Sequence, residues 1–154
     1  MNTINTTYSK ILIAIDGSDA SMHAAAHAIS LAEKYNAQLV ILNVLDVYTL
    51  KQTSSSIIVA PTYGLKEVVE VMRLVQQWVD KIKKEAEEKN IQSKAEIIEL
   101  EKSVVATIVN YAESEKIDLI VVGTKGRSGL KKLLLGSVAE GVVTYAHCPV
   151  LVVK

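Results

Sequence analysis

Short apolar segments alternate with longer amphipathic segments along the 154-residue chain. Five of the short segments are rich in Ile, Val and Leu, and they cover residues 10–16, 37–45, 94–100, 118–123 and 148–153. Four of them are nearly continuous apolar runs, which are typical of strands in a parallel sheet covered on both faces. The pattern therefore predicts a sheet of five strands.

Helical periodicity fills the intervals between these strands. Apolar positions recur at three- and four-residue spacing in 18–35, 64–89, 103–115 and 137–146, and Ser18 and Ser103 stand where N-caps are expected. In the second helix the expected core positions are Val68, Met72, Val75, Val79, Ile82 and Ala86. The alternation predicts a single α/β domain over residues 1–154, Rossmann-like, with right-handed crossovers and helices on both faces.

The expected strand order predicts where a ligand binds. In doubly wound folds the first strand is usually central, so the chain runs outward through the second and third strands and returns to the other side. This gives an open sheet of order 3-2-1-4-5, and ligands bind where the order reverses, beyond the carboxyl ends of the strands. Asp16 and Gly123 stand at the two strand ends that border this crevice.

Overall composition excludes several classes of partner. The 17 basic and 17 acidic residues balance, so nothing suggests nucleic acid or an anionic membrane as a partner. The single cysteine excludes an internal disulfide and fits a reducing compartment. The N-terminal "MNTINTTYSK" has no signal-peptide core, and no apolar run approaches the ~20 residues of a membrane span. We expect a cytoplasmic protein without a membrane or nucleic-acid partner.

Local composition is unusual after the fourth strand. The segment "GTKGRSGLKKLLLGSVAE" (123–140) holds four of the seven glycines, and residues 119–139 contain four basic residues and no acidic one. A helix is expected to begin near Gly136, with its free N–H groups facing the crevice, which together outline a phosphate site. Alternatively, the glycines only turn the chain and the lysines form a solvated loop. The familiar phosphate-binding glycine motifs are absent and do not decide between these interpretations.

The spacing G-x2-G-x9-G-S, through Gly123, Gly126, Gly136 and Ser137, resembles the ATP-binding signature of the universal stress protein family. "KILIAIDGSDAS", "LNVLD" and "CPVLVV" are also similar to that family, so the resemblance spans the whole chain. It implies a five-stranded fold, a role in stress adaptation, common homodimerisation and, with the full glycine pattern, ATP binding.

The resemblance also implies roles for individual residues. Ala14, Ile15 and Asp16 would border the adenine and ribose, and Val44 would close the adenine side. Further along the chain, the implied contacts to the nucleotide and its phosphates are Val122, Gly123, Gly126, Gly136, Ser137 and Val138, with Arg127 as a weaker phosphate contact. The implied ligand is ATP, alone or with Mg²⁺. Asp16 has an alternative role, which is to cap the first helix together with Ser18.

Three classes of function compete. A phospho-receiver needs an aspartate after the third strand, where the sequence reads "IELEKS", so this class is set aside. An ATP-using enzyme needs a group that orients the attacking nucleophile, and residues 119–139 hold neither His nor a carboxylate. We therefore expect a nucleotide sensor or carrier without catalytic residues. The alternative is a slow ATPase, or another ATP-using enzyme, in which residues 46–63 close over the nucleotide and bring Asp46, Tyr48 or Tyr63 inward.

Two further expectations concern metals and assembly. His23 and His27 lie four residues apart on a helix, but no third ligand is evident, so no metal site built by protein side chains is expected. The last strand, "VLVV", has no charge or proline to discourage pairing at a sheet edge. Together with the family resemblance, this predicts a homodimer through residues 148–154.

Overall fold

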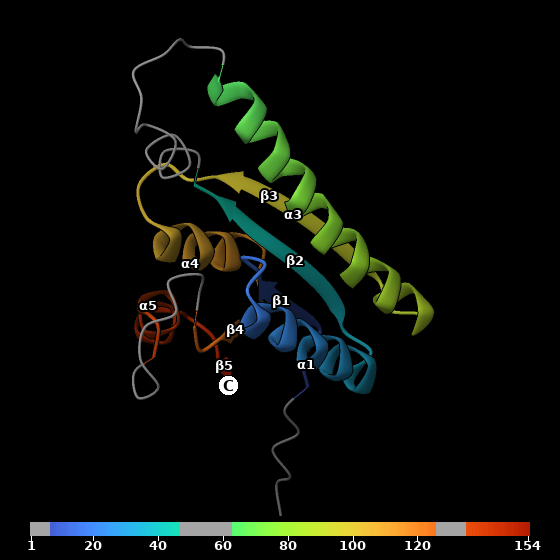
Figure 1. Ribbon diagram of the computed structural model, residues 1–154. Helices are drawn as coiled ribbons and strands as arrows, with labels where there is room; N and C mark the ends of the chain where they lie inside the picture. Colours follow the sequence, from blue (N-terminus) through green and yellow to red (C-terminus); the bar gives the residue numbers. More distant parts are fainter. Residues whose placement is uncertain (1–6, 47–62, 126–134) are drawn as a thin grey trace, which may run out of the picture.

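The computed structural model describes residues 7–46, 63–125 and 135–154. Strands and helices alternate through these residues, as expected from the sequence (Figure 1). In chain order the elements are β1 (Lys10–Ala14), α1 (Asp19–Tyr35), β2 (Gln38–Leu45), α3 (Tyr63–Glu88), β3 (Ser93–Glu99), α4 (Val104–Ser114), β4 (Leu119–Gly123), α5 (Ser137–Tyr145) and β5 (Val150–Val153).

The strands form one parallel sheet in the order β3-β2-β1-β4-β5, which confirms the predicted topology. β1 is central, and its residue Ile13 is paired with Ile41 of β2 on one side and Val121 of β4 on the other. Because the chain leaves β1 in one direction and later returns to its other side, the strand order reverses between β1 and β4. The carboxyl ends of these two strands therefore meet at the position where ligands bind in such folds.

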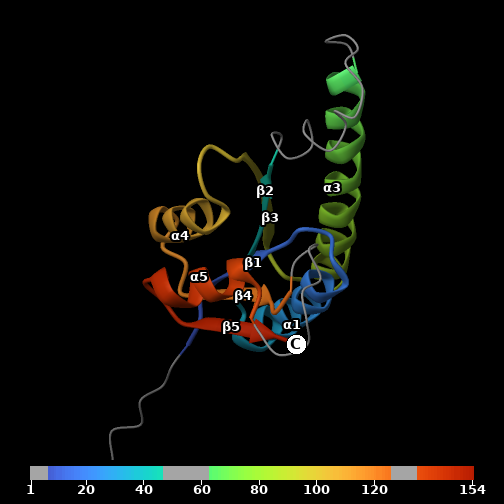
Figure 2. The ribbon, with the colours of Figure 1, turned by 60° about the vertical axis from the view of Figure 1, so that its left-hand side comes forward.

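Helices cover both faces of the sheet, and each face has its own apolar core. α1 and α3 pack on one face, where Ile11, Ile13 and Ile41 are fully buried. α4 and α5 pack on the other face, over Leu12 and Ile120. Figure 2 shows the two helical layers on opposite sides of the strands. Two-sided burial is the physical reason why the strands read as continuous apolar runs.

Two helix starts agree with the expected N-caps. The hydroxyl of Ser18 accepts a hydrogen bond from the Ser21 backbone N–H at 3.2 Å. The hydroxyl of Ser103 accepts one from the Ala106 N–H at 3.3 Å. Both side chains satisfy an N–H group that the helix itself leaves without a partner.

One expected core position of the second helix is wrong. Val75, Val79, Ile82 and Ala86 of α3 are buried, but Met72 is 46% exposed. Val71, one residue earlier on the helix, packs against the core together with Val68. Spacings of three and four residues fit both position 71 and position 72, and the helix turns Val71 toward the core.

Two strand boundaries differ from the prediction by two residues, and the other differences are of one residue. β1 ends at Ala14 rather than Asp16, because the chain turns away from the sheet through Gly17, which has a φ of 79°. β5 begins at Val150 rather than Cys148, and Pro149 before it has no N–H to give to a ladder.

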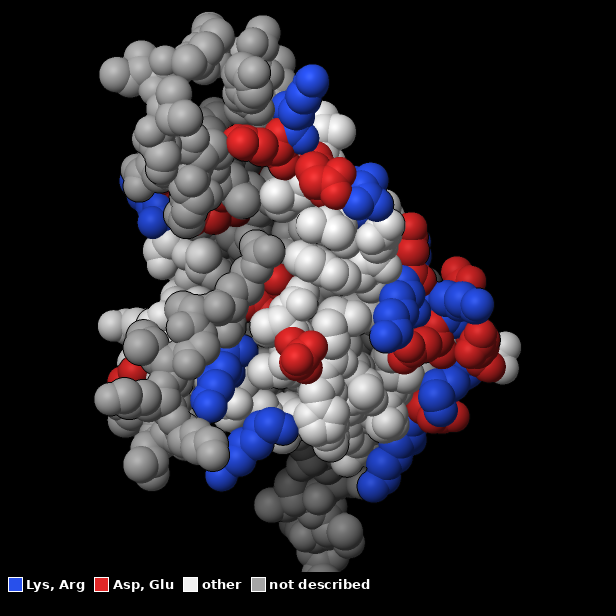
Figure 3. Space-filling view, in the orientation of Figure 1, with Lys and Arg blue, Asp and Glu red and all other residues white. Residues whose placement is uncertain are grey.

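Charged side chains of both signs alternate along α3 on the face shown in Figure 3. One example is the pair formed by Arg73 and Glu70, one helical turn apart. Such a face is solvated rather than specialised for a polyanion. In the part of the chain described, no helix is both long and apolar enough to cross a bilayer.

Candidate functional site

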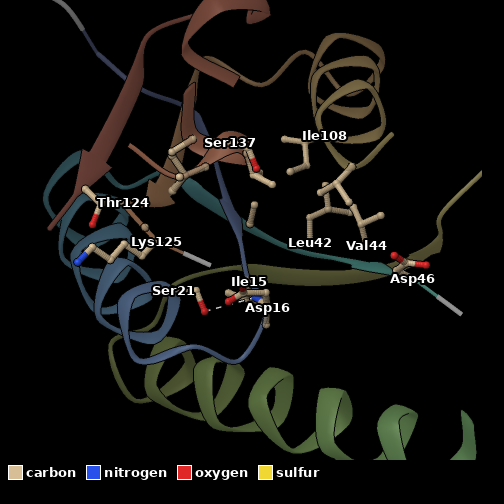
Figure 4. A pocket seen from close by; sticks show the side chains of 17 residues that line it. Ile15, Asp16, Ser21, Leu42, Val44, Asp46, Ile108, Thr124, Lys125 and Ser137 are labelled. Atoms are coloured by element: carbon tan, nitrogen blue, oxygen red, sulfur yellow. Dashed lines mark hydrogen bonds between the residues drawn. The ribbon is translucent and has the colours of Figure 1, made fainter. Parts of the chain in front are cut away.

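A pocket of about 380 Å³ opens at the carboxyl ends of β1, β2 and β4 (Figure 4). α4 and the first turn of α5 complete its wall. The residues that line it are Ala14, Ile15, Asp16, Ser21, Leu42, Val44, Asp46, Val104, Ile108, Val122, Gly123, Thr124, Lys125, Gly136, Ser137, Val138 and Ala139. The pocket thus lies in the crevice that the strand order predicts.

Nine of the eleven candidate site residues line this one pocket. They come from four separate segments of the chain: Ala14, Ile15 and Asp16; Val44; Val122 and Gly123; and Gly136, Ser137 and Val138. Gly126 and Arg127 lie outside the described residues, as do Tyr48 and most of the 46–63 connection. The fold therefore brings together every candidate position that it describes.

The turn after β1 presents the Asp16 carboxylate. Its Oδ1 atom accepts hydrogen bonds from the Ser18 hydroxyl at 2.6 Å and from the Ser18 backbone N–H at 3.0 Å. Ser18 caps α1 with the same hydroxyl, so Asp16 supports the cap and lines the pocket at the same time. The two roles considered for Asp16 in the sequence are compatible.

Gly123, at the end of β4, approaches the first turn of α1 very closely. A Cβ atom at this position would lie 2.8 Å from the backbone carbon of Ala20 and 3.0 Å from the backbone nitrogen of Ser21. Backbone atoms of a helix do not give way as a flexible side chain does. Packing of α1 against β4 is therefore a reason for this glycine, in addition to its place in the pocket wall.

The start of α5 forms the polar end of the pocket. Gly136 is its N-cap, and the Gly136 N–H donates to the Thr124 carbonyl at 2.7 Å, which joins the helix start to the residue after β4. The first-turn N–H groups of Ser137, Val138 and Ala139 have no acceptor within the helix. Together with the helix dipole, such groups favour an anion. Lys125 adds a basic side chain to the same wall.

The remaining walls are largely apolar. Ala14, Leu42, Val44, Ile108 and Val122 surround the space between the sheet and α4. Figure 4 shows Val44 and Asp46 on the opposite side of the pocket from Lys125. The pocket therefore has an apolar part and a separate part suited to an anion.

Sequence reasoning missed several lining residues. Leu42 shares a strand face with Val44, so alternation along β2 would have found it. Val104 and Ile108 belong to the first turns of α4, and their place in the wall depends on how that helix packs on the sheet. Asp46, which the sequence placed at the ligand only in the enzyme alternative, is a second carboxylate in the pocket wall besides Asp16.

Comparisons with known proteins agree on one family. The model described as the universal stress protein family matches residues 7–154. Universal stress protein MJ0531 of Methanocaldococcus jannaschii is 44% identical over 150 residues, which cover 96% of this chain and 82% of that protein. The solved structure of protein MJ0577 is 29% identical, with a TM-score of 0.78 and 97% of each chain covered. The structure of a universal stress protein in complex with cAMP is 25% identical, with a TM-score of 0.64. The match covers 97% of this chain and 98% of that protein.

Proposed function

This chain belongs to the universal stress protein family, and on that basis we propose that it binds ATP in the crevice between β1, β4 and α5. In this proposal it acts in stress adaptation as a nucleotide sensor or carrier, without fast turnover of the nucleotide. The observation that carries the proposal is the meeting of nine of the eleven candidate residues in one pocket. The expected location remains the cytoplasm.

The two parts of the pocket suit the two parts of a nucleotide. The apolar walls around Leu42, Val44 and Ile108 offer contact surface to a base, and Asp16 offers acceptors to base or ribose hydrogens. The first turn of α5, with the Ser137 hydroxyl, offers donors to phosphate oxygens. A volume of about 380 Å³ falls within the range of small-molecule pockets. The relative solved with cAMP supports a purine nucleotide as the ligand class.

Mg²⁺ fits this proposal as a companion of the phosphates. Mg²⁺ keeps several waters and is usually held by phosphate oxygens together with one or two carboxylates. Asp16 and Asp46 are the carboxylates that line the pocket. In Figure 4 Asp46 lies across the pocket from the phosphate end, so phosphate oxygens and waters would supply most of the ligands of the ion, and the ion would neutralise phosphate charge.

Slow ATP hydrolysis is the second candidate function, and the position of Asp46 in the wall favours it. Hydrolysis needs a group that orients water in line with the γ-phosphate. Amides and hydroxyls that bind phosphate equally well in the ground and transition states give affinity without rate. In Figure 4 Asp46 lies across the pocket from Lys125 and Ser137, which form the proposed phosphate end. We therefore retain the sensor as the first candidate.

We expect the wild-type protein to bind ATP and to turn it over far more slowly than about 1 s⁻¹, the low end of ordinary enzymes. With ATP at 100 times its dissociation constant, binding should stabilise the fold by about 2.7 kcal/mol. This corresponds to a rise in Tm of roughly 5–11 °C. Differential scanning fluorimetry measures the shift, and a single-turnover assay with Mg²⁺ and labelled ATP measures the rate in the same preparation.

The absence of a thermal shift would contradict the binding proposal. A rate near 1 s⁻¹ that is lost in Ser137→Ala would instead establish the ATPase. Identification of the small molecule released from denatured, cell-purified protein would show which nucleotide the protein carries.

We also propose a homodimer through residues 148–154. β5 is an edge strand that pairs with β4 alone among the described strands, and its sequence is entirely apolar. Exposed edges of this kind are usually covered, and isologous pairing across a two-fold axis is the commonest solution.

Val152→Lys should weaken this dimer about tenfold or more, because pairing would bury an ammonium group without a partner. Light scattering at micromolar concentration measures the change in mass. Val69→Lys is the matched control, since Val69 is 64% exposed on α3, far along the chain from β5. Circular dichroism must show that both variants are folded, and a monomeric wild-type protein would contradict the proposal.

A further inference from the structure

Two polar side chains are buried among the described residues, and both contact the same peptide unit. Ser21 and Asn43 are each 4% exposed. The Asn43 Nδ2 atom donates a hydrogen bond to the Ile15 carbonyl at 2.9 Å. The Ser21 hydroxyl accepts one from the Asp16 N–H at 3.3 Å. This carbonyl and this N–H belong to the one peptide that joins Ile15 to Asp16, so the peptide is held from both sides.

This peptide lies at the point where the chain leaves the sheet. The Ile15 N–H still donates to the Leu42 carbonyl of β2 at 2.9 Å, which continues the pairing of β1 by one residue. Two residues later Gly17 has a φ of 79°. Rotation of the Ile15–Asp16 peptide would change the φ of Asp16 and therefore the direction of its Cβ. The two buried side chains prevent that rotation.

Packing alone does not explain why the buried residue 43 is an asparagine. Asn43 faces the core formed with α1 and α3, and its neighbours on that face of β2 are Ile41 and Leu45. Its Oδ1 atom is buried and finds no hydrogen-bond partner among the described residues. An unpaired buried amide oxygen is unfavourable, so an aliphatic residue would suit the core better. What the amide adds is the donor to the Ile15 carbonyl.

We infer that Asn43 and Ser21 are positioning residues that fix the Ile15–Asp16 peptide and thereby direct the Asp16 carboxylate at the nucleoside part of the ligand. The inference rests on the proposed nucleotide site. Ser21 also lines the pocket, whereas Asn43 is absent from its wall and acts on the ligand only through the backbone. Asn43 therefore gives the cleaner test.

The inference predicts a loss of affinity for ligands that contain a nucleoside and no loss for the phosphate chain alone. Asn43→Leu keeps the approximate size of the side chain and removes the donor. Isothermal titration calorimetry should show about a tenfold weaker affinity for ATP, the effect of about one hydrogen bond. Affinity for inorganic tripolyphosphate, which lacks a nucleoside, should stay within about twofold of wild type. Ser21→Ala should weaken ATP binding in the same way.

Testing Asn43→Leu in a second variant, Asp16→Ala, separates an effect on the position of Asp16 from a general loss of stability. In Asp16→Ala, the further change Asn43→Leu should have no additional effect on ATP affinity, because the group that it positions is gone. Asn43→His retains an N–H donor at a similar distance from the backbone and should recover part of the affinity. Ile41→Val is the matched control, since it removes one methyl group from the same face of the same strand, and it should bind both ligands as wild type does.

The possible outcomes distinguish this inference from the proposed function. If ATP and tripolyphosphate affinities fall together, or if Asn43→Leu still weakens ATP binding in Asp16→Ala, the positioning role is wrong. If Asp16→Ala weakens ATP binding while Asn43→Leu and Ser21→Ala do not, the nucleotide site stands and this inference fails. If the wild-type protein does not bind ATP, both fail. If Asn43→Leu does not fold, the affinities of the smaller variant Ser21→Ala for ATP and tripolyphosphate test the inference instead.

Discussion

Replacing Gly123 with alanine should destabilise the protein by about 3 kcal/mol, the upper end of what overpacking usually causes. The new methyl group would lie 2.8 Å from the Ala20 backbone carbon and 2.9 Å from its oxygen, so α1 must move away from β4. For a chain of this length the free-energy loss corresponds to a fall in Tm of roughly 6–12 °C. Thermal denaturation followed by circular dichroism measures the change.

Gly141→Ala is the matched control for this experiment. A Cβ at Gly141 would also be close to a neighbour, at 2.7 Å and 2.9 Å from the two γ-carbons of Val105, but these are side-chain atoms rather than helix backbone. Gly141 lies inside α5, where alanine is favoured over glycine by up to about 1 kcal/mol. The Tm of this variant should therefore fall less than that of Gly123→Ala. Equal destabilisation by the two substitutions would show that contact with the helix backbone is not the deciding feature.

Replacing Gly136 with valine should weaken ATP binding about a hundredfold. Gly136 is the N-cap of α5 and lines the pocket beside the first-turn N–H groups. A β-branched side chain there would occupy the space in front of these donors. Blocking two hydrogen bonds to charged phosphate oxygens, each worth about 1.5 kcal/mol, accounts for a loss of this size. Calorimetric titration with ATP measures the affinity.

The neighbouring residue provides the control for Gly136→Val. Leu135 is 45% exposed and does not line the pocket. Leu135→Ala should therefore bind ATP with wild-type affinity. If Gly136→Val gave the same thermal shift with ATP as the parent protein, the phosphate end of the proposed site would be wrongly placed.

The fold was largely predictable because burial on two faces leaves a strong pattern in the sequence. Segments such as "ILIA" and "LIVV" allow few alternatives to a central parallel strand, and the crossover rules then limit the strand order. The errors arose where the sequence pattern fits more than one position. The helical spacing fits Met72 as well as Val71, and it is Val71 that packs against the core. Asp16 directly follows an apolar run, although β1 already ends at Ala14.

The candidate site was predictable to the extent that it depends on strand ends. Asp16 and Gly123 follow from topology, since each stands at or near the carboxyl end of a strand, and Val44 was implied by the family resemblance. Val104 and Ile108 depend on the packing of α4 over the sheet, which local periodicity does not determine. Asn43 did leave a signal, because it is the one polar residue inside the run "LVILNVL", but its partner Ile15 becomes evident only when β1 and β2 are side by side.

The close approach of Trp78 to Gly17 has a consequence for spectroscopy. The indole of Trp78 occupies the space that a side chain at Gly17 would need, with ring atoms 2.1 to 2.4 Å from the position of a Cβ. Trp78 is the single tryptophan of the chain, so all tryptophan emission comes from an α3 side chain that lies against the turn after Asp16. Emission excited in the indole band therefore reports on this turn without an attached dye, and it provides an optical signal at the edge of the pocket.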